Sequence, residues 1–151
     1  MKIIVSVNNQ IVQKGLCSII FESVNLNPLI VEDKLQLISI LEMYNQCLLI
    51  VEINHLDKDE ILFIEILVKQ YPFIKIIVLI NNSYNYSDIN LFNSEKINII
   101  KFCDSNIIIS KTIINCYKTI VSDFILKKEN ILREKKVLNC YQKENWKFVN
   151  Y

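Results

Sequence analysis

The chain of 151 residues contains no alanine, a single glycine, two prolines and a single histidine. The glycine, Gly15, lies within a helical pattern, which excludes the glycine-rich loops that cradle phosphate groups. The histidine, His55, stands beside Asp57 and Asp59, and a solvated loop is favoured there over a metal site. No catalytic arrangement that needs a histidine can be argued around it. The composition therefore favours neither an enzyme nor a bound metal or cofactor.

Long apolar runs are missing as well. No segment reaches the ~18 apolar residues of a membrane-spanning helix, and the first apolar stretch is too short for a signal peptide. The cysteines are odd in number and occur singly, without the CxxC spacing of zinc sites or redox motifs. We therefore expect free thiols, a cytoplasmic location and no association with a membrane. These cysteines are Cys17, Cys47, Cys103, Cys116 and Cys140.

Apolar runs and segments of helical periodicity alternate along the chain. The β-branched and near-continuous apolar runs predict strands at 2–7, 27–32, 47–53, 74–80 and 97–101. Helical spacing of apolar residues predicts helices at 10–22, 33–44, 58–71, 86–95 and 106–128, with a further helix in 129–151. This alternation is typical of right-handed crossovers. It predicts an α/β fold, a doubly wound five-stranded parallel sheet with a C-terminal helical extension.

In such a sheet ligands bind beyond the carboxyl ends of the strands, so the residues there decide the chemistry. One carboxylate, Glu52, lies in the apolar third strand, within "CLLIVEINHLDKDE". The residues that end the other predicted strands are Val7 and Asn8, Ile80, and Lys101.

At this point the chain resembles a known family, the receiver domain of two-component response regulators, in particular the LuxR/NarL type. The resemblance covers about residues 2–120 and is carried by "NNQIVQKGLCSII", "QCLLIVEINHLDKDEI" and "YPFIKIIVLINN". It implies a flavodoxin/CheY-like fold, with a receiver-like domain at 1–126 and a helical tail at 127–151.

Receiver domains catalyse their own phosphorylation with two acids after the first strand, an acceptor aspartate, a hydroxyl and a lysine, around Mg²⁺. By the resemblance these positions fall on Val7, Asn8, Glu52, Ile80 and Lys101. Only the lysine has kept its type. The resemblance therefore implies a degenerate phosphorylation site without phosphotransfer.

Two interpretations of Glu52 are open. It could mimic a phosphorylated aspartate, because its carboxylate reaches one methylene further. Alternatively, it could form a plain ion pair with Lys101 that neutralises a leftover site, since a buried charge needs a partner. The second interpretation is favoured because Ile80 cannot donate the hydrogen bond through which the family senses phosphate.

The tail has a resemblance of its own. "ILREKKVLNCYQKEN" resembles the first helix of a LuxR-type DNA-binding domain, and the sequence ends before a recognition helix, which suggests a truncated regulator. Residues 127–151 hold seven Lys and Arg against three Glu, enough for non-specific contact with phosphates. Specific DNA binding is disfavoured.

Apolar side chains also recur through 106–148, more than one sheet could cover, and such a surface is typical of a partner site. The residues chosen for this interaction are Ile113, Tyr117, Phe124 and Trp146. The sequence thus predicts a non-phosphorylatable pseudo-receiver that acts through a protein partner or as a homodimer in signalling or transcription regulation. The alternative is a DNA-binding response regulator that uses its basic tail, and an enzyme of flavodoxin-like architecture is disfavoured.

Overall fold

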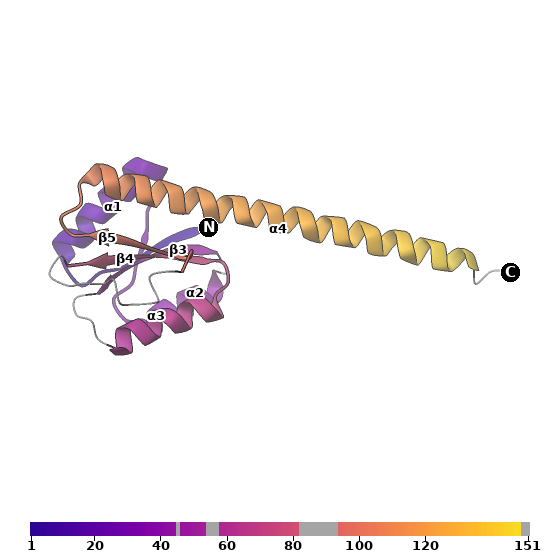
Figure 1. The fold of residues 1–151 in the computed structure, drawn as a ribbon, viewed down its shortest axis with the longest axis horizontal. Coiled ribbons are helices and arrows are strands. Elements are labelled where there is room, and N and C mark those ends of the chain that lie inside the picture. Colours follow the sequence, from indigo (N-terminus) through magenta and orange to yellow (C-terminus); the bar gives the residue numbers. More distant parts are fainter. Residues whose placement is uncertain (45, 54–57, 82–93, 149–151) are drawn as a thin grey trace. The chain divides into compact units, whose positions relative to one another are not determined.

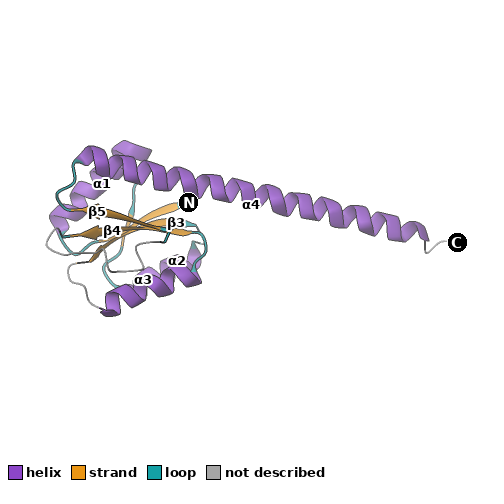
Figure 2. Cartoon of the chain, in the orientation of Figure 1, coloured by secondary structure: helices purple, strands orange, loops and turns teal. Residues whose placement is uncertain are grey.

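The fold is described from a computed structural model that defines residues 1–44, 46–53, 58–81 and 94–148, with the side chains of 139–148 outside the described part. Strands and helices alternate from residue 2 to residue 80 (Figures 1 and 2). The strands are β1 (Lys2–Ser6), β2 (Leu29–Ile30), β3 (Cys47–Ile53), β4 (Ile74–Ile80) and β5 (Ile97–Lys101). The helices are α1 (Gln10–Val24), α2 (Lys34–Met43), α3 (Lys58–Gln70) and α4 (Asn106–Phe148).

The strands form one parallel sheet in the order β2-β1-β3-β4-β5. The order reverses between β1 and β3, which is the switch point of a doubly wound sheet. The register places Ile53 beside Ile80 and Ile80 beside Lys101. The expected fold class is confirmed. The strand ends that carry the candidate site belong to neighbouring strands of the sheet.

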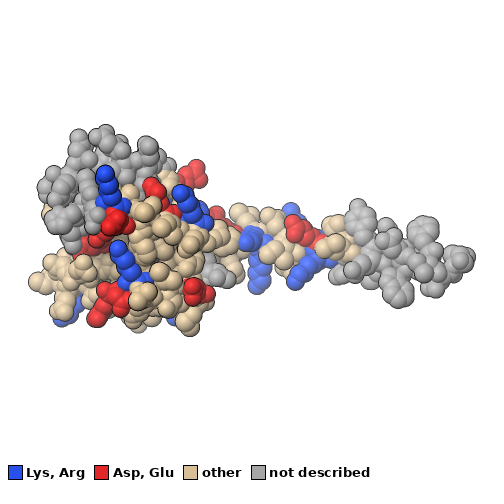
Figure 3. Space-filling view, turned by 90° about the horizontal axis from the view of Figure 1, so that it is seen from below, with Lys and Arg blue, Asp and Glu red and all other residues tan. Residues whose placement is uncertain are grey.

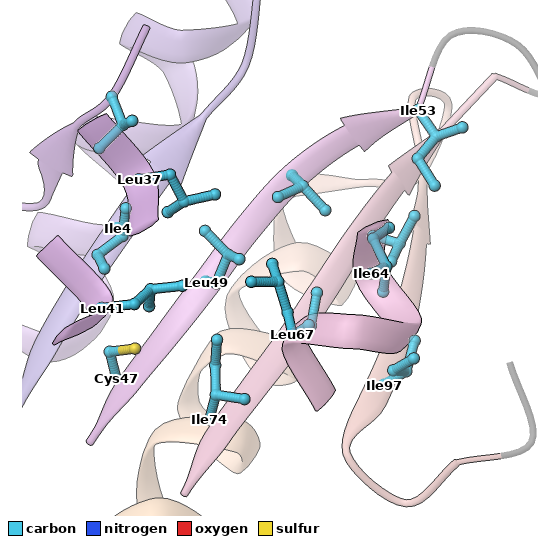
Figure 4. Packing of buried hydrophobic residues seen from close by; sticks show 14 of the residues in the cluster. Ile4, Leu37, Leu41, Cys47, Leu49, Ile53, Ile64, Leu67, Ile74 and Ile97 are labelled. Carbon is cyan, nitrogen blue, oxygen red and sulfur yellow. The ribbon is translucent and has the colours of Figure 1, made fainter. Parts of the chain in front are cut away.

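Two apolar clusters hold the domain together, one on each face of the sheet. On one face, α2 and α3 contribute Leu37, Leu41, Ile64 and Leu67, which pack on side chains of the strands (Figure 4). On the other face, α1 and the first part of α4 cover the sheet (Figure 1). The central strands β3 and β4 are buried almost throughout, because both of their faces are covered.

The ends of α1 and α2 follow from local chemistry. Asn9 caps α1, since its Oδ1 accepts hydrogen bonds from the N–H of Ile11 (3.0 Å) and of Val12 (3.2 Å). Asp33 caps α2 by accepting from the N–H of Gln36 (2.7 Å). Asparagine and aspartate are favoured at these positions because the first N–H groups of a helix have no partner within it.

The C-terminal region differs from the expectation of two successive helices. Residues 106–148 form one helix, α4, because neither proline nor glycine interrupts the segment. The expected helix at 86–95 falls largely on residues 82–93, which lie outside the described part, as do His55 and Asp57.

The chain divides into two compact units, Met1–Ile120 and Val121–Tyr151. The first unit holds the sheet and both apolar clusters. In the second unit every described side chain from Ser122 to Leu138 is exposed. The division falls six residues before the boundary at 126/127 drawn from the sequence, and that boundary stays a prediction. Within the described residues, the helices are too short or too polar to span a bilayer.

Candidate functional site

Glu52 lies near the carboxyl end of β3 and is half-buried. Its Oε2 accepts a hydrogen bond from the backbone N–H of Asn8 (3.0 Å), with the N–H of Asn9 at 3.5 Å. These two N–H groups belong to the turn that leads into α1, where the helix dipole also favours a negative charge. Glu52 therefore joins the third strand to the turn after the first strand.

The expected ion pair between Glu52 and Lys101 is not formed, which corrects the favoured interpretation. Lys101 ends β5 with an exposed side chain, and its backbone N–H donates to Oδ2 of Asp104 at 2.8 Å. A half-buried carboxylate can be satisfied by backbone donors, so it needs no cation beside it. Sequence reasoning missed these partners, because it compared side chains and the donors are peptide groups.

Two of the five positions that the resemblance assigned to a phosphorylation site belong to the apolar core. Val7 is 5% exposed and packs in the cluster beneath α1 and α4, whereas Ile80 is 1% exposed and packs in the cluster beneath α2 and α3. Asn8 is exposed. A divalent ion such as Mg²⁺ prefers carboxylate and other oxygen ligands, which neither Val7 nor Ile80 can supply. The residues present do not fit the ion that the receiver family uses.

A hollow of about 160 Å³ lies beside Glu52, at the carboxyl ends of β1, β2 and β3. Glu32, Asp33, Glu52 and Glu60 all line it, together with Lys34. The Lys34 ammonium lies over the ring of Phe63, 5.0 Å from the ring centroid, which offers it a cation–π contact. Within the described part of the chain, no group of three or more His, Cys, Asp or Glu is arranged to hold a metal ion. Glu32, Asp33 and Glu60 were not among the functional residues chosen from the sequence, although each lies at a strand end or helix start beside the switch point.

Two of the described thiols, those of Cys47 and Cys116, are buried in the core. Burial raises the pKa of Cys47 to about 12 and also raises the pKa of Cys116 above its ordinary value. The Cys116 thiol lies 3.2 Å from Oδ1 of Asn98, to which it donates. Because the thiolate is the reactive form, both residues are inert components of the core.

The residues predicted to meet a partner have different surroundings. Ile113 is completely buried in the cluster beneath α4, so its assignment to an interaction surface is wrong. Tyr117 is half-buried and packs against the same cluster. Phe124 is 49% exposed and available for contact. The side chain of Trp146 lies outside the described part.

Searches of protein-family models and of curated proteins found no match to this sequence. Among solved structures, a two-component transcriptional regulator, AraC, from Clostridium phytofermentans ISDg is similar, with a TM-score of 0.63 and 16% identity. The match covers 81% of this chain and 96% of that chain. A pilus assembly-related protein from Burkholderia pseudomallei K96243 has a TM-score of 0.62 and 11% identity, covering 81% and 90%.

An uncharacterized protein from Neptuniibacter caesariensis is also similar, with a TM-score of 0.67 and 18% identity, over 85% of this chain and 93% of that chain. At these identities the likeness establishes the fold. The chain has the CheY-like receiver fold that the resemblance implied, and function has to be argued from its residues.

Proposed function

We propose that this chain is a pseudo-receiver, a cytoplasmic signalling domain that undergoes no phosphorylation and acts by contact with protein. The proposal starts from the CheY-like fold, which a two-component transcriptional regulator shares. Fold alone does not determine function, so the proposal depends on the site. Its main support is the burial of Val7 and Ile80 in the two apolar clusters, at positions where a receiver needs an acid and a hydroxyl.

The contacts of Glu52 add to this argument. In a receiver the acceptor carboxylate must be free to attack a phosphoryl donor while Mg²⁺ neutralises the incoming charge. Here the carboxylate already accepts from the backbone of Asn8, and the two acids that would hold the ion are a valine and an asparagine. A second anion brought to this place would meet the four carboxylates that line the hollow beside Glu52, which outnumber the single lysine there, Lys34. Glu52 therefore has a structural role in the proposed function.

The test is incubation of the full chain with acetyl phosphate, or with beryllofluoride, in the presence of Mg²⁺. We expect no added phosphoryl group in the mass spectrum and no saturable shift of the amide signals of Asn8 and Glu52. The matched variant Glu52→Asp restores the acceptor type but leaves the ion site without its acids, and it should behave in the same way. A mass gain of one phosphoryl group in the wild-type protein would refute the proposal.

DNA binding through the tail is the alternative function. The basic residues of the described tail are accompanied by acids: Lys127 and Lys128 precede Glu129, and Glu134 lies between Arg133 and Lys135. Side chains of both signs are visible along this part of α4 (Figure 3). Such mixing weakens the uniform positive field that phosphate binding needs. Titration of duplex DNA at increasing salt tests the alternative, which predicts tight binding that falls steeply with salt.

A further inference from the structure

One side of the second unit combines exposed apolar side chains with lysines. Five apolar side chains between residues 124 and 138 are 42% to 60% exposed. Every seventh residue of an α-helix returns to nearly the same side, so these five form two lines along α4, one of residues 124, 131 and 138 and one of residues 125 and 132. The side chains are those of Phe124, Ile125, Ile131, Leu132 and Leu138.

Lys128 and Lys135 lie on the line between these two apolar lines, and both are exposed. Every residue three or four positions from Lys128 is apolar, and the same holds for Lys135 except at Asn139. Residues at this spacing are the neighbours of a side chain on a helix surface, so neither lysine has an acid beside it there. We call the two lysines and the five apolar residues the basic seam.

The acids of this part of α4 lie away from the basic seam. Asp123, Glu129 and Glu134 are each about 100° or more around the helix from both lysines, since successive residues turn by about 100°. The basic seam therefore carries positive charge alone. Its ammonium groups are left for carboxylates that come from outside this helix.

Two possible occupants fit the basic seam poorly. In a parallel pair with a second copy of this chain each lysine meets its own copy, and in an antiparallel pair about Ile131 the side chain of Lys128 lies beside Lys135 twice. Like charges that meet in this way oppose association. A helix that lies in an anionic membrane surface keeps its lysines on the polar side, whereas Lys128 and Lys135 stand in the middle of the apolar side.

We propose that the basic seam binds an amphipathic helix of another protein, in which two carboxylates seven residues apart stand within the apolar face. Each carboxylate pairs with one lysine, and the apolar side chains on both sides of the lysines pack against those of the partner. From Phe124 to Leu138 the seam is about 21 Å long at a rise of ~1.5 Å per residue, so a partner helix of about four turns covers it. This inference rests on the proposed function and specifies the kind of protein that the chain contacts.

Fluorescence anisotropy of a labelled synthetic peptide, titrated with the full chain, tests the inference. The glutamate peptide has about 20 residues, with leucines along one face and two glutamates seven residues apart in the middle of that face. The lysine peptide is identical except that lysines replace the two glutamates. Because the contact is small, we expect a Kd on the order of 10 micromolar for the glutamate peptide and a Kd at least about tenfold higher for the lysine peptide.

Charge reversal in the chain should reverse this preference. Lys128→Glu should raise the Kd of the glutamate peptide by at least about tenfold, since an opposite-charge pair becomes a like-charge pair. The double variant Lys128→Glu/Lys135→Glu should bind the lysine peptide more tightly than the glutamate peptide. The control is Arg133→Glu, which makes the same change of net charge as Lys128→Glu on the far side of the helix and should leave both Kd values unchanged.

Circular dichroism of each variant verifies that helix content is kept, so that weaker binding cannot be attributed to unfolding. Equal affinity of the wild-type chain for the two peptides, or no binding of either, refutes the proposal. Sedimentation of the chain alone and flotation with vesicles of equal parts phosphatidylcholine and phosphatidylserine test the other two occupants, and self-association or vesicle binding tighter than that of the glutamate peptide also refutes it. None of these results touches the phosphorylation test, so failure of the basic seam and failure of the proposed function are distinguishable.

Discussion

Backbone N–H groups do for Glu52 what a metal ion and its ligands do for the acceptor carboxylate of a receiver. Two peptide donors from the turn after β1 face the carboxylate, and the nearest of them, that of Asn8, lies at 3.0 Å. These donors need no particular side chain at the positions that carry them. Asn8 can therefore occupy a place where a receiver has an acid. Through its hydrogen bond to Asn8, the Glu52 carboxylate connects β3 to the turn that follows β1.

Two single substitutions distinguish the hydrogen bond between Glu52 and Asn8 from the expected ion pair between Glu52 and Lys101. Glu52→Ala should lower the free energy of unfolding by about 1–2 kcal/mol, because it removes the acceptor of a charge-assisted hydrogen bond. Lys101→Met should change it by less than ~0.5 kcal/mol, since its side chain is exposed and makes no pair with Glu52. Urea unfolding of both variants measures the difference. Equal losses would mean that the two residues are coupled after all.

Sequence reasoning located the site better than it identified the contacts. It placed Glu52, Ile80 and Lys101 at the correct strand ends, because near-continuous apolar runs mark buried parallel strands and their limits. It could not foresee that peptide groups satisfy Glu52, since backbone donors leave no trace in residue types. It also placed Ile113 on the surface, because isoleucines occur on several sides of the first turns of α4. Only packing shows that Ile113 faces the sheet and Ile107 faces solvent.

At the scale of elements, capping side chains account for the helix starts that the sequence predicted well. Asp33 accepts from Gln36, and Gln36 in turn accepts through Oε1 from the backbone N–H of Glu32 at 3.2 Å. This reciprocal arrangement is close to a capping box, which fixes where a helix begins. The C-terminal helices were harder to delimit, because the charged residues near 127–129 look like a boundary although they are good helix formers.

The cap of α2 provides a prediction at this scale. Asp33→Ala should lower the free energy of unfolding by about 1 kcal/mol, because an N–H at the start of the helix loses its acceptor. Asp33→Asn keeps an oxygen in the same place and should cost only a few tenths of that amount. Thermal unfolding of the two variants compares them. If asparagine were as harmful as alanine, the charge of Asp33 in the hollow would matter more than its hydrogen bond.

On the scale of the whole molecule, the two units differ in what stabilises them. The first unit is closed by two apolar clusters, in which residues such as Leu49 and Ile77 are fully buried. The described side chains of the second unit from Ser122 to Leu138 are all exposed. A long helix without tertiary burial depends on its own hydrogen bonds and on a bound partner, so its stability should be low in the isolated chain.

Hydrogen exchange followed by mass spectrometry should reveal this difference. We expect peptides from residues 48–51 and 76–78 to exchange slowest, since opening them requires global unfolding. Peptides from 121–138 should exchange much earlier in the isolated wild-type chain, and should gain protection when the glutamate peptide is added. Exchange at one common rate in both units would contradict the division into two cooperative parts.

The burial of Val7 and Ile80 also has an evolutionary consequence. Val7→Asp would place a carboxylate in an apolar cluster at a cost of several kcal/mol, and Ile80→Thr would exchange a packed ethyl group for a hydroxyl at a further cost. Each substitution would therefore weaken the protein before any ion could be bound. In a pseudo-receiver of the proposed kind, selection for a stable fold would then oppose the gain of a phosphorylation site one substitution at a time. A pseudo-receiver of the proposed kind could then change its exposed helix while positions 7 and 80 remain fixed as core.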